Sequence, residues 1–267
     1  MVNVTATIDF RAMAGAPFDP ISSTLRSMFG TDDLPGLTRG LLVHDPAGWI
    51  PASSLSDGTH LPQLLDAAAR RWRGSPHAAA ALAWKSYSYW LALPAVLGWA
   101  SARRVPLLRA DDVLVHFEDH RPLLTLGYRR TIDVAVLPSD PLAISGLPEV
   151  VVVPDEAALL ETFRATLLDE HVNPLLDAIH GQVRVGTRTL LGSVASGVAY
   201  GLLRAADWLP GSTRDNIATL LTALELDDLI ELVDGPGGQL NVQRKTCCLA
   251  FTLPQPKLCS GCVIKPS

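Results

Sequence analysis

The first 246 residues of this 267-residue chain contain no cysteine, and the whole chain has only four. Positive charge is also scarce, because 22 Lys and Arg stand against 27 Asp and Glu and give a formal net charge of -5 at pH 7. Proteins that bind along nucleic acid need a basic excess to neutralise phosphates. A nucleic-acid partner is therefore disfavoured.

Long uninterrupted apolar runs are missing as well. The most hydrophobic stretch, residues 78–100, is interrupted by Lys85, Ser86, Ser88 and Pro94. A membrane-spanning helix needs about 20 largely apolar residues, so we expect a buried helix here and no integral membrane segment. The amino terminus has acidic residues and no apolar core behind a basic start, which does not resemble a secretory signal. These features predict a cytoplasmic protein.

Helices and a small sheet are expected in the first half. The first fifty residues show no sustained period and are left unassigned. Apolar residues recur at helical spacing over residues 61–73, and Ser75-Pro76 then opens a second helix that is kinked or ended near Pro94. Short runs rich in Val, Ile, Leu and Thr over residues 105–137 predict an antiparallel meander, and residues 150–154 predict a further strand.

The second half is predicted to be helical. An acidic first turn starts a helix at Asp155, which Pro174 breaks or restarts. The next helix, over residues 187–209, carries small residues that let another backbone approach closely. A last helix is expected from Ser212 to about Val233, before a turn rich in glycine.

These patterns predict an α+β fold, with a mostly helical body, a small antiparallel sheet and a carboxy-terminal cysteine segment. We divide the chain into a mixed region over residues 1–154, a helical region over 155–234 and a cluster-binding segment over 235–267. The three are expected to pack as one unit, since 28.6 kDa suits one large domain or two that are closely packed.

All four cysteines lie near the carboxyl end, as Cys247, Cys248, Cys259 and Cys262, with the spacing C-C-x10-C-x2-C. Clustered cysteines are typical of metal ligands or redox groups. Three interpretations are open: two disulfides, a structural zinc site or a [2Fe-2S] cluster. A reducing cytoplasm disfavours disulfides. Zinc usually takes two separated pairs of ligands, and adjacent cysteines point in different directions along an extended chain.

A [2Fe-2S] cluster accepts a wider set of sulfur positions, because two irons lie side by side and each needs two thiolates. The spacing matches neither common ferredoxin pattern. Our hypothesis is that Cys259 and Cys262 bind one iron and that Cys247 and Cys248 bind the other.

The carboxy-terminal segment resembles that of the FhuF-type ferric-siderophore reductases, whose mark is C-C-x10-C-x2-C around a [2Fe-2S] cluster. The basic stretch over residues 244–249 is similar to the family's approach to the cysteine pair. Residues 80–94, 170–179 and 190–198 resemble the family's helical segments, so the likeness covers about residues 60–264. One departure is Leu191 and Ser193, where the family's commonest form has Trp and Asn.

The resemblance implies a cytoplasmic oxidoreductase that uses its cluster to reduce chelated Fe(III) to Fe(II) and so releases iron from a ferric siderophore, for which we expect the hydroxamate type. The chain lacks a Rossmann fingerprint, so the expected electron donor is external, such as a ferredoxin or a flavin reductase. His171 is expected to be hydrogen-bonded, and Trp72, Trp84, Trp90 and Trp99 are expected to fill the core. The candidate substrate-binding residues are Arg244, Lys245, Arg204, Arg188 and Trp208.

A second interpretation is also open. The helical segments also resemble the carboxy-terminal region of the siderophore synthetases that work independently of nonribosomal peptide synthetases. The body could then be a siderophore-binding module without catalysis, with zinc holding its carboxy-terminal segment.

Overall fold

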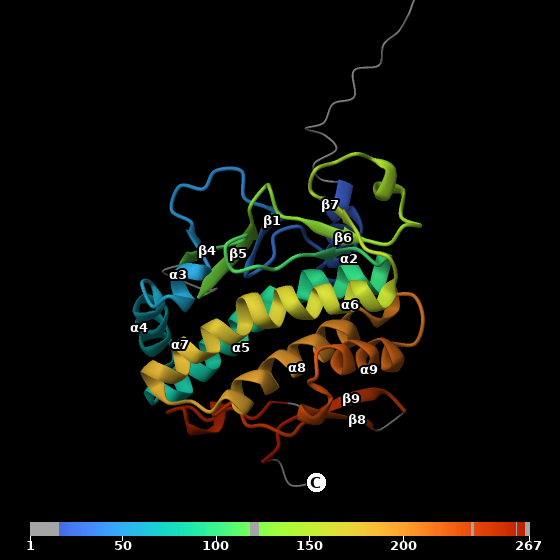
Figure 1. The fold of residues 1–267 in the computed structure, drawn as a ribbon. Coiled ribbons are helices and arrows are strands. Elements are labelled where there is room, and N and C mark those ends of the chain that lie inside the picture. Colours follow the sequence, from blue (N-terminus) through green and yellow to red (C-terminus); the bar gives the residue numbers. More distant parts are fainter. Residues whose placement is uncertain (1–15, 118–122, 236–237, 260, 265–267) are drawn as a thin grey trace, which may run out of the picture.

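The computed structural model describes residues 16–117, 123–235, 238–259 and 261–264. Figure 1 shows the chain in layers, with two small sheets above a layer of long helices, a second helical layer beneath it, and a hairpin and the carboxy-terminal segment at the bottom. The α+β class is confirmed. In the residues described, no helix is both long enough and apolar enough to cross a membrane.

Helix α5 (Pro76–Ala102) is the centre of the fold, and 19 of its 27 residues are buried. It is hydrophobic on all sides, as expected for a helix enclosed by others. The Ser75 hydroxyl accepts a hydrogen bond from the Ala78 amide at its start, and the helix continues past Pro94 rather than ending there. The expected tryptophan packing is confirmed for Trp84 and Trp99, each 1% exposed.

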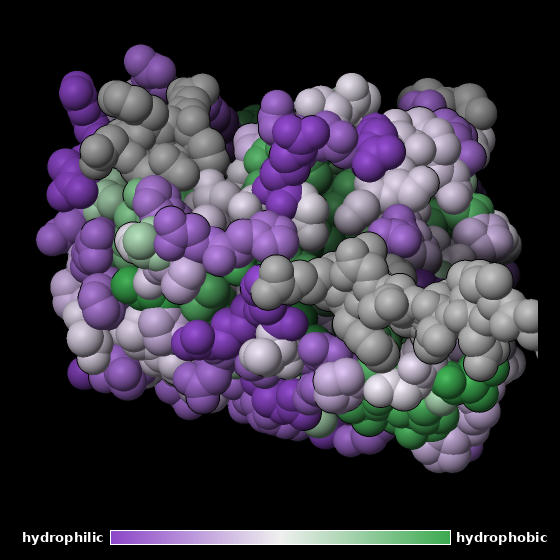
Figure 2. All heavy atoms as spheres, turned by 90° about the horizontal axis from the view of Figure 1, so that it is seen from above, coloured by the Kyte–Doolittle hydropathy of each residue, from purple (hydrophilic) through white to green (hydrophobic). Residues whose placement is uncertain are grey.

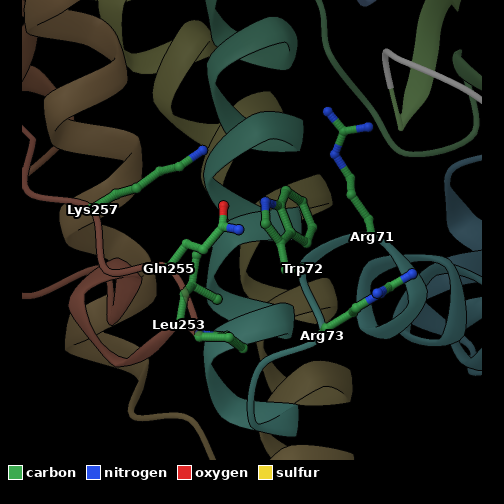
Figure 3. Close-up of a pocket in the computed structure, with 7 residues that line it drawn as sticks. Arg71, Trp72, Arg73, Leu253, Gln255 and Lys257 are labelled. Atoms are coloured by element: carbon green, nitrogen blue, oxygen red, sulfur yellow. The ribbon is translucent and has the colours of Figure 1, made fainter.

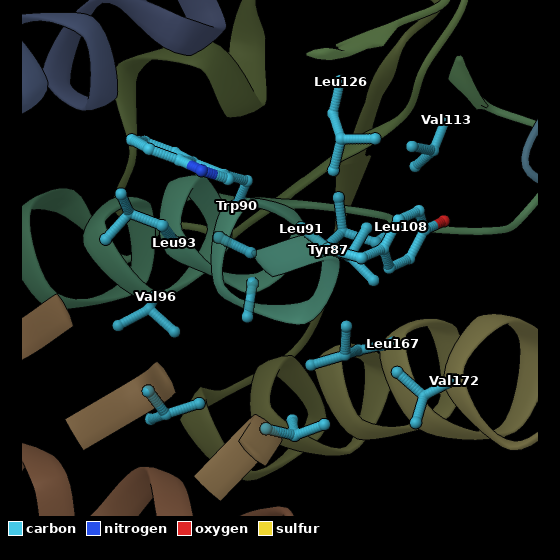
Figure 4. Close-up of a cluster of buried hydrophobic side chains, with 14 of the residues drawn as sticks. Tyr87, Trp90, Leu91, Leu93, Val96, Leu108, Val113, Leu126, Leu167 and Val172 are labelled. Carbon is cyan, nitrogen blue, oxygen red and sulfur yellow. The ribbon is translucent and has the colours of Figure 1, made fainter. Parts of the chain in front are cut away.

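The other helices surround α5. Near the amino end lie η1 (Ala16–Phe18), α2 (Asp19–Phe29), α3 (Ser53–Ser56) and α4 (Leu61–Trp72). In Figure 4, side chains of α5 such as Leu91 meet Leu126 of a strand above and Leu167 of a helix below, so the core is continuous between the layers.

A continuous helical stretch follows the sheets, as α6 (Glu156–Arg164), the π-helix η3 (Ala165–Val172) and α7 (Asn173–Val183). Pro174 was expected to break or restart the helix. The structure shows that the chain stays helical here, because Val172 and Asn173 both have right-handed helical dihedral angles. Pro174 lies in the first turn of α7 directly after the π-helical segment, so the expected break is wrong.

Helix α8 (Thr187–Arg204) packs along α5 through the small residues that the sequence indicates. A Cβ at Gly201 would lie 2.9 Å from Leu93 Cδ1, and one at Gly197 would lie 3.5 Å from Tyr89 Cα. The Trp84 indole N–H donates to the Leu190 carbonyl at 2.8 Å. The predicted close approach of another backbone is confirmed.

The sheets differ from the predicted meander. Strands β4 (Val113–Phe117) and β5 (Leu124–Tyr128) pair antiparallel as expected, but β1 (Leu37–Leu42) pairs parallel with β5, and β2 (Ile50–Pro51) completes this sheet. Strand β6 (Val134–Val136) belongs to a second sheet, in which it lies between β3 (Val105–Pro106) and β7 (Val150–Val152). The short helix η2 (Pro141–Ile144) lies in the connection from β6 to β7. The expectation of one purely antiparallel sheet is therefore wrong. Above these sheets the surface mixes hydrophilic and hydrophobic atoms (Figure 2).

The last predicted helix is also shorter than expected. After η4 (Ala206–Trp208), helix α9 (Thr213–Ala223) starts where predicted, and Ser212 accepts a hydrogen bond from the Asp215 amide. Glu225 then takes a left-handed conformation with φ of 56°, and the chain continues through η5 (Asp227–Leu229). Strands β8 (Ile230–Asp234) and β9 (Leu240–Arg244) form an antiparallel hairpin.

The glycine-rich turn that was expected after the last helix lies between β8 and β9 of this hairpin. Pro236 and Gly237 of that turn lie outside the described residues. The boundary drawn between residues 234 and 235 thus falls inside a hairpin, and the three-part division stays a prediction.

Candidate metal centre

The cysteine segment follows directly from strand β9 and folds against helix α8. The Gly192 backbone lies against Thr246 so closely that a Cβ there would overlap the threonine hydroxyl. On the other side, the Arg244 amide donates to the Gly261 carbonyl at 3.0 Å, and the Tyr200 hydroxyl donates to the Val242 carbonyl at 3.4 Å. These contacts bring the ends of the segment together over one face of α8.

The four thiols therefore lie in one region. Cys248 and Cys262 are buried, whereas Cys247 and Cys259 are half-buried, and none forms a disulfide. The Cys262 amide donates to the Cys259 carbonyl at 3.2 Å, which shapes the turn between them. Burial raises the pKa of the Cys259 thiol, and Cys248 and Cys262 raise it further. These thiols release their protons when a metal binds.

Two cations oppose that rise. Lys85 of α5 and Arg244 of β9 are close enough to Cys259 to lower the pKa of its thiol, although burial prevails. Lys85 was not a predicted site residue, and it lies 162 positions before Cys247 in the sequence. Its only sequence signal was a charge inside an otherwise apolar helix.

Arg244 is the most unusual residue of the site, because its side chain is only 1% exposed. One guanidinium nitrogen, Nη2, donates to the Ser193 hydroxyl at 3.2 Å. The other two, Nε and Nη1, are buried and have no hydrogen-bond partner within the described part of the chain, and the same holds for the Thr246 hydroxyl. Buried donors are rarely left unpaired in proteins, so these groups point to an acceptor at the cysteines.

A thiolate-bound iron–sulfur cluster is such an acceptor. It carries negative charge, and hydrogen bonds to its sulfurs tune its reduction potential. The Leu249 amide already donates to the Cys247 sulfur at 3.3 Å. The surrounding cations and unpaired donors therefore fit a [2Fe-2S] cluster. Among the residues that the structure describes, no three His, Cys, Asp or Glu side chains converge closely enough to hold one metal ion.

The segment also exposes several large apolar side chains. Of the seven large hydrophobic side chains exposed in the described chain, four belong to it: Phe251, Leu258, Val263 and Ile264. Phe251 lies in the short helix η6 (Ala250–Thr252).

The predicted substrate-binding residues do not form one group. Arg244 was proposed to attract a chelate, but its burial leaves it no direct access to a bulky ligand. Lys245 is exposed beside it. Arg188 forms an ion pair with Asp228 at 2.6 Å. The Arg204 guanidinium lies 4.1 Å from the centre of the Phe29 ring. Burial raises the pKa of Tyr89, and the nearby Arg204 partly lowers that pKa again.

Trp208, which completes that set, is 46% exposed and lies in η4. His171 is hydrogen-bonded, as expected: it bonds to the Tyr87 hydroxyl at 2.6 Å and the Leu108 carbonyl at 2.8 Å, and burial lowers its pKa to about 4.

Comparison with known proteins now decides the family. The model described as "Ferric iron reductase FhuF-like transporter" matches residues 82–230, which is more than half of the chain, and the model "FhuF 2Fe-2S C-terminal domain" matches residues 244–263. The chain belongs to the FhuF-like ferric iron reductase family. The second match covers all four cysteines and supports the [2Fe-2S] cofactor.

Two further comparisons complete these findings. No curated protein matches the chain. Among solved structures, ATP-bound aerobactin synthetase IucA from a hypervirulent pathotype of Klebsiella pneumoniae is similar, with a TM-score of 0.50 and 18% identity. The match covers 73% of this chain but only 36% of the synthetase chain. At this identity the likeness concerns the fold alone.

Proposed function

We propose that this FhuF-like protein reduces the Fe(III) of a ferric siderophore, of hydroxamate type, to Fe(II) and so releases iron in the cytoplasm. The observation that carries the proposal is the cysteine segment itself, in which Cys248, Cys259 and Cys262 interact electrostatically, two cations act on Cys259, and the buried Arg244 and Thr246 keep donors that have no partner among the described residues.

A [2Fe-2S] cluster supplies one electron at a time when bound, and one electron converts Fe(III) to Fe(II). The proposed source of that electron is an external ferredoxin or flavin reductase. Hydroxamate oxygens hold the smaller, more highly charged ferric ion better than the ferrous ion, so the chelate weakens after reduction.

The protein's own residues have separate proposed roles. Cys247, Cys248, Cys259 and Cys262 would hold the cluster. Arg244 would compensate its negative charge from inside the protein, where water screens that charge least. Ser193 orients the guanidinium. Ser193 is one of the positions where the chain departs from the family's commonest residue, and this hydrogen bond would give its side chain a role in the site.

The test is iron release from a ferric hydroxamate by wild-type protein and by the Cys247→Ser and Cys262→Ser variants, with a ferrous-specific indicator. We expect both variants to lose release while their far-UV circular dichroism stays that of the wild type. Normal release by a folded Cys262→Ser variant would overturn the proposal. A colourless wild-type protein that contains zinc would favour the non-redox siderophore-binding protein instead.

A further inference from the structure

A basic cleft lies between the end of α4 and the segment that joins the two cysteine pairs (Figure 3). Its volume is about 430 Å³, and it is lined by Arg71 and Arg73 on one side and by Lys257 and Gln255 on the other. None of the described residues that line it is acidic. We call this feature the basic cleft.

Trp72 separates the basic cleft from a second hollow. It is half-buried, and the guanidinium carbon of Arg71 lies 5.4 Å from the centre of its ring. The second hollow has a volume of about 330 Å³ and is lined mainly by apolar and aromatic groups, among them Trp90 and Tyr200. Lys85 is its only charged lining residue among those described. We call this feature the apolar hollow.

The basic cleft is lined partly by the loop between the cysteine pairs, and the apolar hollow contains Lys85, whose charge acts on Cys259. Lys257 is two positions before Cys259 in the sequence, and its amide donates to the Ala250 carbonyl at 3.1 Å, which closes the loop between the cysteine pairs. Leu253 of the same loop reaches the α4–α5 junction, where a Cβ at Gly74 would lie 2.8 Å from it. From the apolar hollow, Lys85 acts electrostatically on Cys259. A ligand in these cavities would be next to the cluster segment.

We propose that the basic cleft and the apolar hollow together bind the ferric chelate, and that they select a hydroxamate chelate carrying a free carboxylate outside the iron's coordination sphere. This inference rests on the proposed function, because it names the substrate class of the same site.

The chemistry of the two cavities supports this division of roles. A ferric ion neutralised by three hydroxamates leaves no charge for three surface cations to recognise, so the basic cleft calls for a negative group elsewhere on the ligand. Arginine binds carboxylates through two parallel N–H donors. The hydrocarbon backbone of the chelate would lie on Trp72 and in the apolar hollow, since binding sites are typically apolar with a few placed polar groups.

The probe is a redox-inert series that isolates peripheral charge. Gallium(III) has the charge of ferric iron but is not reduced. One linear trihydroxamate is used with its terminal amine left free, acetylated or succinylated, so that the gallium complexes are positive by one, neutral or negative by one. Binding is measured by isothermal titration calorimetry at low ionic strength, where surface charges are least screened.

We expect the wild type to bind the negative complex most tightly and the positive one most weakly, by about fivefold for each step in charge, as for one well-placed exposed ion pair. Arg73→Gln and Lys257→Gln should each weaken the negative complex by about the same factor and leave the neutral complex nearly unchanged. The matched control is Arg70→Gln, because Arg70 is an exposed cation of α4 that does not line the cleft.

Equal affinity of the wild type for all three complexes, or no binding at all, would overturn the proposal. An equal loss in Arg70→Gln and Arg73→Gln would also overturn it, because the selectivity would then come from net charge and not from the cleft. Failure of the proposed function gives a different result: charge-selective binding would persist, but iron release from the ferric complexes would be absent.

Discussion

Replacement of the buried Arg244 tests the electrostatic design of the cluster site. Arg244 is 1% exposed, and its Nε and Nη1 have no hydrogen-bond partner among the residues that the structure describes. Hydrogen bonds to charged groups are worth about 1.5–3 kcal/mol each. If about half of the combined value of two such bonds appears only when the extra electron arrives, the reduced state gains about 1.5–3 kcal/mol.

That free energy converts directly into a potential, since a tenfold change in a one-electron equilibrium is about 59 mV or 1.4 kcal/mol. Arg244→Met should therefore lower the midpoint potential by about 65–130 mV. The sign follows because loss of a nearby positive charge destabilises the more negative, reduced cluster. The assay is an anaerobic redox titration followed by visible absorption and by the electron paramagnetic resonance (EPR) signal of the reduced state.

Lys245 provides the matched control, because it is the next residue and carries the same charge in an exposed position. Lys245→Gln should shift the potential by less than about 20 mV, since water screens its charge. Arg244→Lys keeps the charge but loses the forked donors, and should lie between the wild type and Arg244→Met. An Arg244→Met protein with a full cluster and an unchanged potential would refute the reasoning.

Three other predictions concern the fold around the site. Gly192→Ala places a Cβ against Thr246 and should lower both the iron content and the free energy of unfolding, the latter by about 1–3 kcal/mol. The control is Gly197→Ala, where the nearest atom is 3.5 Å from the added Cβ: it should keep the iron content of the wild type and a free energy of unfolding within about 1 kcal/mol of the wild-type value. Burial lowers the pKa of His171 to about 4, so between about pH 6.5 and 4 the unfolded state binds more protons than the folded state. Acidification over that range should therefore lower the free energy of unfolding by about 3 kcal/mol. Urea titrations of wild type and His171→Gln check this, and an equal pH slope in both would contradict it. Removal of the metal by a chelator should leave the helical circular dichroism intact, because the residues of the large hydrophobic core, among those described, all lie at or before Val242 and therefore before the cysteines. A cooperative loss of helix would show instead that the cluster stabilises the helical body.

The local features of the fold were predictable from the sequence. The cap at Ser75, the glycines of α8 and the buried tryptophans of α5 all depend on short-range patterns, which the structure confirms. The cysteine spacing likewise carries its own chemistry, because ligands close in sequence must lie close in space.

Long-range pairing was not predictable in the same way. Strand β1 pairs with β5 across more than eighty residues, and β6 joins β7 instead of continuing the meander, because register and partners depend on the packed core. The segment of β8 has the apolar spacing of a helix end, and only its pairing with β9 makes it a strand. Tertiary contacts overrode local propensity in these cases.

The site was predictable for its ligands but not for its surroundings. Arg244 and Lys245 are neighbours in sequence, and nothing in the pattern indicates that one is buried and the other exposed. Lys85 and Trp72 lie far from the cysteines in the chain, so their roles depend on how the carboxy-terminal segment folds back against α4 and α5. Charge environment and cavity shape are properties of the assembled structure.

The most direct test of the central claim is the iron and acid-labile sulfide content of anaerobically purified protein, read together with its EPR spectrum after reduction. We predict about two irons and two sulfides for each chain and a signal from one unpaired electron, as for a [2Fe-2S] centre. Protein that contains zinc or no metal, without inorganic sulfide and without that signal, would contradict the account.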